Sequence, residues 1–300
     1  MINWKIISDQ ISVASHASFS MVNAVPVAGG DSNQAWHVTG ALNGDNHQGE
    51  THCFIKLNSV EKFDMFAAEA AGLTALSNTH TVKLPQVITQ GIAGQHSFIV
   101  LEYVDLKSQG IDALLGTQLA KMHQNYAAQY GWTQDNTIGV TPQHNAWSTD
   151  WISFWGEQRL GFQLALAARN GYRGALQHMG KRVVDALPVL FEGYTPQPSL
   201  LHGDLWAGNH AFLADGTPVV FDPATYFGDR EVDIAMTELF GGYTAEFYAA
   251  YRQAYPLDAG YKKRKNLYNL YHILNHCNMV SGGYVAQAEN MMQTILKNAG

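Results

Sequence analysis

The chain has 300 residues, of which 46% are apolar and 14% charged, so it can bury a sizeable core without metals or crosslinks. This composition excludes disordered, collagen-like and coiled-coil proteins. The 18 basic and 25 acidic side chains give a formal charge of −7. Such a balance repels a polyanion and argues against a nucleic-acid partner.

The cysteine count and the amino terminus both bear on location. Cys53 and Cys277 are the only cysteines, which is too few for a framework of disulfide bridges. Residues 1–10 lack the basic and then apolar pattern of a signal peptide, and the sequence has no uninterrupted apolar run of about 18 residues. We therefore expect a soluble cytoplasmic protein without membrane contact.

The first third of the chain is predicted to be rich in strands. Turn residues separate short apolar runs, and they predict strands at 19–28, 34–40, 51–57, 86–90 and 97–103. A single helix is predicted over 60–77, where apolar side chains recur at steps of three and four. Residues 1–104 are therefore expected to form a small β-rich lobe with one helix.

After Val104 the pattern becomes helical, which places a second, larger lobe at 105–300. Helices are expected near 111–126, 149–169, 174–191, 229–254, 261–280 and 284–297. One β-hairpin is expected among them, at 211–221, around the Asp215-Gly216 turn. The predicted fold class is α+β with two lobes, and ligands are expected in a cleft between the lobes.

Three oxygen-bearing side chains stand out in the second lobe. Asp204 and Asn209 are five residues apart in the run HGDLWAGN at 202–209, and Asp222 ends the second strand of the hairpin. In phosphoryl transfer, a loop Asp orients the attacking hydroxyl and accepts its proton, while an Asn and a second Asp hold Mg²⁺. The alternative is that Asp204 and Asn209 only satisfy the backbone of a turn.

Lys56 is a cation in an otherwise apolar strand, and Glu69 on the predicted helix is its candidate partner. In the kinase scheme such an ion pair holds the ammonium against the nucleotide phosphates. A strand-edge lysine and a solvated helix glutamate are the alternative.

Two further segments fit a nucleotide. Gly29 and Gly30 would let backbone amides approach a phosphate, although most such pairs are simply turns. Glu102, Tyr103 and Val104 end a strand at the predicted lobe junction, where backbone groups could contact an adenine edge; the alternative is an ordinary sheet strand.

Taken together, these motifs resemble the fructosamine kinase (ketosamine-3-kinase) family. The likeness rests on the run at 202–209, on DPATYFGDREVDIAM at 222–236 and on ELFGG at 238–242. Within them, the Asp-Leu-Trp and Gly-Asp-Arg-Glu blocks are specific among kinase-like enzymes. Gly29, Gly30, Lys56 and Glu69 fall in the family's order, although the Lys and Glu positions are shared broadly. The resemblance covers nearly the whole chain and implies a protein-kinase-like fold related to aminoglycoside and choline kinases.

The resemblance also implies a role for each residue. Asp204 matches the proton acceptor, Asn209 and Asp222 match the magnesium ligands, and Lys56 with Glu69 matches the phosphate anchor. Residues 102–104 match the adenine-binding hinge. The implied reaction transfers the γ-phosphoryl group of ATP to the 3-hydroxyl of a fructosamine or ribulosamine, free or protein-bound. The 3-phosphate is unstable in that family, so the implied role is deglycation.

Several points stay open in the sequence. Trp206 offers an apolar face to a sugar, or it plugs the space under the catalytic loop. At least one of the charged residues Asp229, Arg230, Glu231 and Asp233 is expected to brace that loop. The basic run at 262–265 is interpreted as a solvated helix face. Choline- or aminoglycoside-type kinases and a catalytically silent binding module are the alternative functions, and a monomer is expected.

Overall fold

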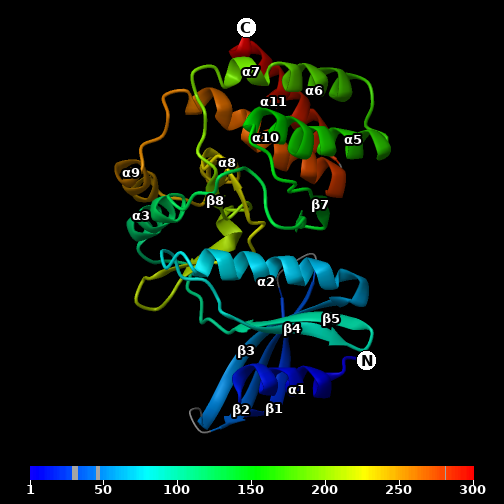
Figure 1. Ribbon diagram of the computed structural model, residues 1–300, viewed down its shortest axis with the longest axis vertical. Coiled ribbons are helices and arrows are strands. Elements are labelled where there is room, and N and C mark those ends of the chain that lie inside the picture. Colours follow the sequence, from blue (N-terminus) through cyan, green and yellow to red (C-terminus); the bar gives the residue numbers. More distant parts are fainter. Residues whose placement is uncertain (29–32, 45–47, 281) are drawn as a thin grey trace. The chain divides into compact units, whose positions relative to one another are not determined.

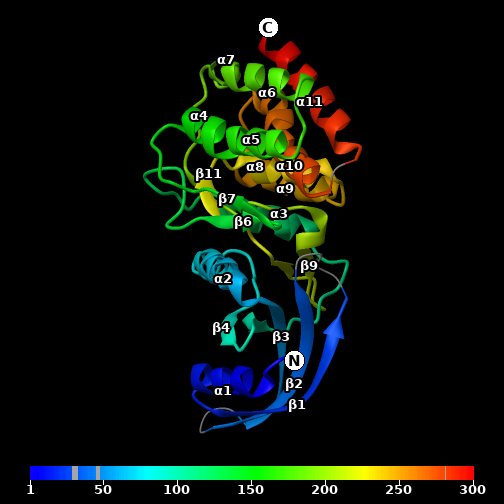
Figure 2. The same ribbon diagram turned by 90° about the vertical axis from the view of Figure 1, so that its right-hand side faces the viewer.

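The computed structural model describes residues 1–28, 33–44, 48–280 and 282–300, which form two compact units. The first unit contains Met1–Gly110 and Ala211–Asp222, and the second contains Ile111–His210 and Pro223–Gly300. Figures 1 and 2 trace both units. The predicted hairpin thus groups with the first unit, although the sequence places it in the second lobe. The functional division into 1–104 and 105–300 stays a prediction.

The first unit is built on a five-stranded antiparallel sheet with the strand order β1-β2-β3-β5-β4. Its strands are β1 (Ser18–Val27), β2 (Gln34–Asn43), β3 (Gln48–Ser59), β4 (Val87–Ala93) and β5 (His96–Glu102). The predicted meander is confirmed. Because side chains alternate along a strand, Ile55 and Leu57 of β3 face one side of the sheet and Lys56 faces the other.

Two long helices cover opposite faces of this sheet, α1 (Trp4–Ser15) and α2 (Phe63–Ser77), with the short 3₁₀ turn η1 (Val60–Lys62) leading into α2. The helix α1 is not predicted from the sequence. Its side chains Ile7 and Ile11 pack in the core with Ile55 and Leu57. The helix α2 is the predicted one, and it lies on the face that carries Lys56.

The predicted hairpin forms from β9 (His210–Phe212) and β10 (Pro218–Val220). Gly216 adopts φ +85°, and the Asp215 carboxylate accepts a hydrogen bond from the Thr217 amide, as expected for an Asp-Gly turn. Single bridges connect Val219 to Lys83 and Phe212 to Lys107. These bridges attach the hairpin to the first unit, so Asp222, two residues after β10, also belongs to that unit.

The second unit is mainly helical. Its helices are α3 (Asp112–Met122), α4 (Trp151–Phe154), the π-helix η2 (Trp155–Gly161), α5 (Phe162–Arg169), α6 (Ala175–Asp185), α7 (Leu187–Leu190), the 3₁₀ turn η3 (Ala207–Asn209), α8 (Glu231–Leu239), α9 (Ala245–Ala254), α10 (Tyr261–Val280) and α11 (Tyr284–Ala299). Its short antiparallel pairs are β6 (Asn136–Ile138) with β7 (Thr141–Gln143), and β8 (Ser199–Leu201) with β11 (Tyr226–Gly228).

The prediction of one helix over 229–254 is wrong, because α8 and α9 are separate. Gly241 and Gly242 lie between them with φ of +74° and +95°, a conformation that ends a right-handed helix. The helix α10 passes through the core, where Leu267, Ile273 and Leu274 are fully buried. Within the described ranges, no helix has both the length and the apolar character needed to cross a bilayer.

Candidate active site

Lys56 of β3 lies at the centre of a polar cluster in the first unit. Its Nζ atom lies 2.6 Å from Glu69 Oε1 and 2.5 Å from Asp222 Oδ1. The side chains of Lys56 and Glu69 are only 9% and 11% exposed. The sequence places Lys56 and Glu69 as partners, and the structure brings them together.

The electrostatics of this cluster favour a charged lysine. Burial by itself lowers the pKa of Lys56, but the carboxylates of Glu69 and Asp222 outweigh burial and leave that pKa raised. Burial and the charge of Asp222 raise the pKa of Glu69, while Lys56 opposes them. The ammonium is therefore a fixed positive charge at neutral pH.

Asp222 has an unusual backbone conformation, with φ +57° two residues after the end of β10. Asp tolerates this left-handed region better than most residues because its short side chain can bond locally. Its side chain is 46% exposed, unlike that of Glu69. One carboxylate oxygen contacts Lys56, so the second oxygen is the atom that suits a cation.

The predicted nucleotide hinge ends β5. The backbone amide of Glu102 donates to Gln86 O at 2.8 Å, and the Glu102 carboxylate lies 3.2 Å from Lys83 Nζ. The Tyr103 ring stacks on His37 with centroids 3.9 Å apart, and Val104 is half-buried. Gly29 and Gly30 lie outside the described residues, so their predicted contact with phosphate stays a prediction.

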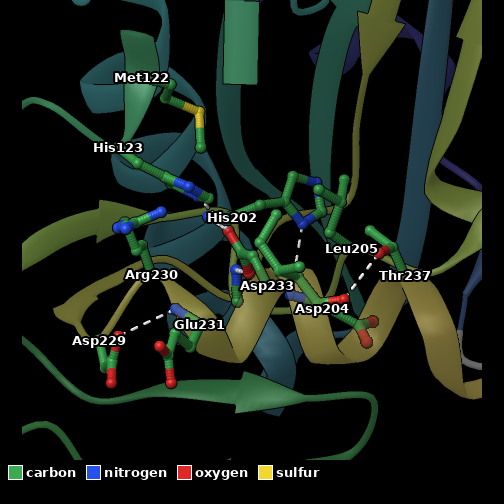
Figure 3. Close-up of polar contacts among 12 residues, drawn as sticks. Met122, His123, His202, Asp204, Leu205, Asp229, Arg230, Glu231, Asp233 and Thr237 are labelled. Atoms are coloured by element: carbon green, nitrogen blue, oxygen red, sulfur yellow. Dashed lines mark hydrogen bonds and ion pairs between the residues drawn. The ribbon is translucent and has the colours of Figure 1, made fainter. Parts of the chain in front are cut away.

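In the second unit, the turn that leads to Asp204 rests on a buried carboxylate. Asp233 of α8 accepts hydrogen bonds from the backbone amides of His202 at 2.7 Å and Gly203 at 2.8 Å. His123, which directly follows α3, lies 3.0 Å from the same carboxylate through Nε2. Figure 3 shows His123, His202 and Asp233 grouped beside Asp204. Asp233 is therefore the residue that braces the loop.

The charge state of this brace follows from its surroundings. Burial alone raises the pKa of Asp233, but the bond and charge of His123, the charge of His202 and the Gly203 amide leave the pKa lowered. Burial lowers the pKa of His123, and Asp233 offsets only part of that effect. An anionic aspartate and a neutral imidazole therefore hold the turn.

The other charged residues at the start of α8 have different partners. Asp229 accepts hydrogen bonds from Tyr268 and Tyr194, and Arg230 donates to Tyr251. Glu231 forms a two-bond ion pair with Arg264 at 2.8 and 3.0 Å. Arg264 is only 2% exposed, so the interpretation of 262–265 as a solvated face is wrong at this position.

Asp204 and Asn209 lie side by side in the loop after β8. The Asn209 amide nitrogen donates to the Asp204 backbone oxygen at 2.8 Å and to its carboxylate at 3.2 Å. This contact directs the Asn209 carboxamide oxygen away from the carboxylate. Asn209 is buried and Asp204 is half-buried. The pair is compact enough to orient one hydroxyl and to supply one metal ligand.

Trp206 is 41% exposed, so it does not fill a space under the loop. Its indole lies against Gly208, where an added Cβ would come within 2.2 Å of the ring. Tyr243 donates to the backbone oxygen of Leu205, the residue just before Trp206, at 3.3 Å. The loop thus presents an aromatic face whose position depends on a glycine.

The predicted residues therefore form two sets, each within one unit. Lys56, Glu69 and Asp222 meet in the first unit, and Asp204 and Asn209 meet in the second. His123 is the residue that the sequence patterns miss. Its only sequence signal is a single polar side chain at the end of an apolar helix stripe.

Comparison with known proteins gives one consistent result. Residues 3–298 match the fructosamine kinase family. A protein of Synechocystis sp. named "Probable ketoamine kinase" is 44% identical over 297 residues, which cover 98% of this chain and 97% of that protein. An Arabidopsis thaliana protein named "Protein-ribulosamine 3-kinase, chloroplastic" is 41% identical over 248 residues, which cover 81% of this chain and 76% of that protein.

Solved structures agree with these relatives. The crystal structure of a Haemophilus somnus protein assigned as a fructosamine-3-kinase superposes with a TM-score of 0.86 and 30% identity, covering 97% of each chain. An ADP-bound aminoglycoside phosphotransferase superposes with a TM-score of 0.66 and 12% identity, covering 98% of this chain and 97% of that one. The second match shows the kinase-like fold alone.

Proposed function

Because this chain belongs to the fructosamine kinase family, we propose that it is an ATP-dependent kinase that phosphorylates the 3-hydroxyl of a ketosamine. The observation that carries this proposal is the match along residues 3–298, together with full-length relatives named as ketoamine kinases. The proposed role is deglycation, in which the unstable 3-phosphate leads to release of the sugar from the amine.

Lys56 is the proposed anchor of the nucleotide phosphates. Its positive charge is maintained by Glu69 and Asp222, so it is available to an anionic ligand without a change in protonation. Glu69 fixes the direction of the lysine side chain from α2. Glu102, Tyr103 and Val104 are proposed to contact the adenine, and the amides of Gly29 and Gly30 the phosphates.

The side chains present suit Mg²⁺. The Asn209 side-chain nitrogen donates to Asp204, so the side-chain oxygen is the atom that would bind the metal. Asp222 has one carboxylate oxygen that does not contact Lys56. Mg²⁺ is commonly held by one or two such oxygens together with substrate phosphates. Asn209 and Asp222 would hold the ion, which when bound neutralises charge on the phosphates.

Asp204 is the proposed proton acceptor. The acceptor's 3-oxygen forms a bond to the γ-phosphorus as the bond from that phosphorus to the bridging oxygen of ADP breaks, and the hydroxyl proton passes to the Asp204 carboxylate. Asn209 orients that carboxylate, and Asp233 fixes the turn before it. Catalysis then depends on positioning more than on covalent chemistry by the protein.

Trp206 is the proposed platform for the sugar. Its exposed indole belongs to the same loop as Asp204, and aromatic faces bind the apolar face of sugars well. An acceptor screen distinguishes fructose, ribulose and erythrulose as the sugar.

The test measures ADP formation by the parent and by Asp204→Ala with glycated amines that carry different sugars. Choline and an aminoglycoside serve as the rival acceptors. The proposal predicts turnover with a ketosamine, loss of that turnover in the variant, and nucleotide binding retained. Preference for choline or the aminoglycoside would move the chain to the rival class. ATP binding without turnover on any acceptor would indicate a binding module.

The remaining proposals concern partners and location. We propose a monomer in the cytoplasm that acts on free or protein-bound ketosamines and binds neither nucleic acid nor membrane. The two cysteines are buried and unpaired, as is common in a reducing compartment. Sedimentation velocity tests the monomer, because a dimer would sediment faster and give twice the molar mass.

A further inference from the structure

Arg159 is a buried cation that donates hydrogen bonds to carbonyl oxygens. It lies in the π-helix η2, is 0% exposed, and donates to His144 O at 2.5 Å and to the side-chain oxygen of Asn145 at 2.7 Å. Its guanidinium carbon lies 4.1 Å from the centre of the Tyr226 ring. A π-helical turn is uncommon and is often found at functional sites.

Arg159 sets the orientation of a chain of side-chain amides. Because a guanidinium can only donate, Asn145 must turn its oxygen toward Arg159 and its nitrogen away. That nitrogen donates to the Asn136 oxygen at 3.0 Å, so the Asn136 nitrogen points outward and donates to the backbone oxygen of Thr225 at 2.8 Å. The direction of every bond in this branch follows from Arg159.

A second branch ends on the neighbouring backbone oxygen. The Gln143 nitrogen donates to the Asn136 oxygen at 2.9 Å and to Ala224 O at 3.1 Å. Its own oxygen accepts from the Tyr271 hydroxyl at 2.8 Å, which fixes the amide in this orientation. Two consecutive carbonyls, those of Ala224 and Thr225, are thus held by side-chain amides.

The Ala224 backbone lies directly against the turn before Asp204. Its amide donates to His202 O at 2.8 Å. Gly203 has φ +84°, and a Cβ added there would lie 2.1 Å from Ala224 O. The strand β11 that follows pairs with β8, the strand that leads into the loop. A shift of residues 224–225 must therefore move the turn.

We propose that Arg159 is a positioning residue, which acts through Asn145, Asn136 and Gln143 to hold Ala224 and Thr225 under the turn and thereby orients the Asp204 carboxylate. This inference rests on the proposed role of Asp204. Asp233 holds the turn from one side through amide hydrogens, and the Arg159 network holds its partner strand through carbonyl oxygens. The two supports are chemically independent.

The informative variant is Asn145→Asp. Its carboxylate keeps the contact with Arg159 as an ion pair, so the fold retains a strong bond at this position. It has no N–H for Asn136, whose amide must then turn its nitrogen toward residue 145 and its oxygen toward Thr225 O. The hydrogen bond from Asn136 to Thr225 O is therefore lost, while the contact of residue 145 with Arg159 is preserved.

A matched control is Asn278→Asp on α10. Asn278 also donates from a partly buried amide to a backbone oxygen, that of Gln163 at 3.0 Å, and its own hydrogen bonds do not go to residues 224–225. The Asn278→Asp variant therefore also loses a side-chain amide donor in the second unit. Gln143→Glu is a second test variant, in case Asn145→Asp does not fold, because it disrupts the branch that ends on Ala224.

The experiment combines hydrogen exchange, melting temperature and steady-state kinetics on the full chain. We expect Asn145→Asp to speed amide exchange in residues 200–206 and to lower kcat about tenfold to 100-fold, as small misplacements of reacting groups do. The KM for ATP and the melting temperature should stay near those of the parent. Asn278→Asp should leave exchange at 200–206 and kcat unchanged.

Parent-like exchange at residues 200–206 and parent-like kcat in both Asn145→Asp and Gln143→Glu would overturn the inference. So would a kcat that falls only in step with melting temperature, equally in the control. The exchange readout does not depend on turnover. Failure of the proposed function itself would appear separately, as turnover retained by Asp204→Ala.

Discussion

The two sets of candidate site residues are supported in different ways. In the first unit, Lys56, Glu69 and Asp222 contact one another directly, and each charge supports the next. In the second unit, Asp204 is positioned by side chains that do no chemistry themselves, namely Asp233 and the amides that Arg159 orients. The candidate site residues of the first unit thus support one another, whereas those of the second unit depend on a surrounding set of buried side chains.

This difference predicts distinct consequences of mutation. Changes in the Lys56 cluster should reduce activity with little loss of stability, because that cluster is small and borders solvent at Asp222. A Cβ forced into the Asp204 turn itself, as in Gly203→Ala, should reduce activity and stability together, whereas Asn145→Asp keeps its bond to Arg159 and should reduce activity alone. Four experiments follow, from the largest expected effect to the smallest, and the first two, Lys56→Met and Gly203→Ala, test this contrast directly.

Lys56→Met is expected to lower kcat/KM for ATP by about 100- to 1,000-fold, the usual cost of removing one electrostatic stabiliser of a transition state. Stability should change little, because Glu69 has a raised pKa and can take up a proton when the ammonium is gone. Steady-state kinetics and thermal melting measure both. The control is Lys107→Met, which removes a half-exposed ion pair with Asp105 in the same unit. A large loss of stability in Lys56→Met would break the contrast.

Gly203→Ala is expected to destabilise the chain by about 3 kcal/mol and to reduce kcat strongly, because both φ and the contact with Ala224 O forbid a Cβ. Gly94→Ala in the first unit separates the two causes. Gly94 has φ +70° with nothing within 4 Å, so only the backbone cost of about 1 kcal/mol applies. Urea unfolding compares them. Equal losses would mean that the close approach at Gly203 carries no energy.

Gly208→Ala is expected to raise the KM for the ketosamine several-fold and to leave the KM for ATP unchanged. The added Cβ meets the Trp206 indole, an exposed side chain that can move, rather than backbone. Kinetics with each substrate varied in turn provide the measurement. A fall in melting temperature with an unchanged KM for the acceptor would instead make Trp206 a structural residue.

His272→Gln should alter only the response to acid. Burial lowers the pKa of His272 to about 3, against an ordinary value of 6.5, so the folded state keeps the imidazole neutral. Below pH 6.5 the unfolded chain takes up a proton that the folded chain does not, and stability falls by about 1.4 kcal/mol per pH unit until about pH 3. The variant should therefore lose less stability than the parent between pH 6.5 and 4.5. Unfolding curves at both pH values compare the slopes, and equal slopes would contradict the assignment.

The parts of the molecule that sequence predicts well are those with a local signal. Strand alternation and the Asp215-Gly216 turn predict the sheet and the hairpin, and residue type predicts the Lys56–Glu69 pair. The helix α1 is missed because its buried stripe, Ile7 and Ile11, is too short to stand out from the polar residues around it. The break after α8 depends on the left-handed conformation of Gly241, which a glycine permits but does not require.

The frame of the second unit has no local signal at all. Asp233 is one of three acids within five residues, and only tertiary contacts distinguish it from Asp229 and Glu231. Asn136 contacts Thr225 across 89 positions of the chain. No spacing in the sequence predicts such a contact, because a side-chain amide can bond to any backbone group that the fold brings near it. The residues proposed to do chemistry thus carry a local sequence signal, whereas most of the side chains that position Asp204 are identified only by tertiary contacts.

The most direct test follows the γ-phosphoryl group itself. ATP labelled with ³²P at the γ position is mixed with a ribulosamine or fructosamine, and the label is traced in a single turnover by the parent, Lys56→Met and Asp204→Ala. We predict that the parent places the label on the 3-hydroxyl of the sugar and that both variants transfer far less. Label that appears as inorganic phosphate at the same rate with and without the acceptor would contradict the account.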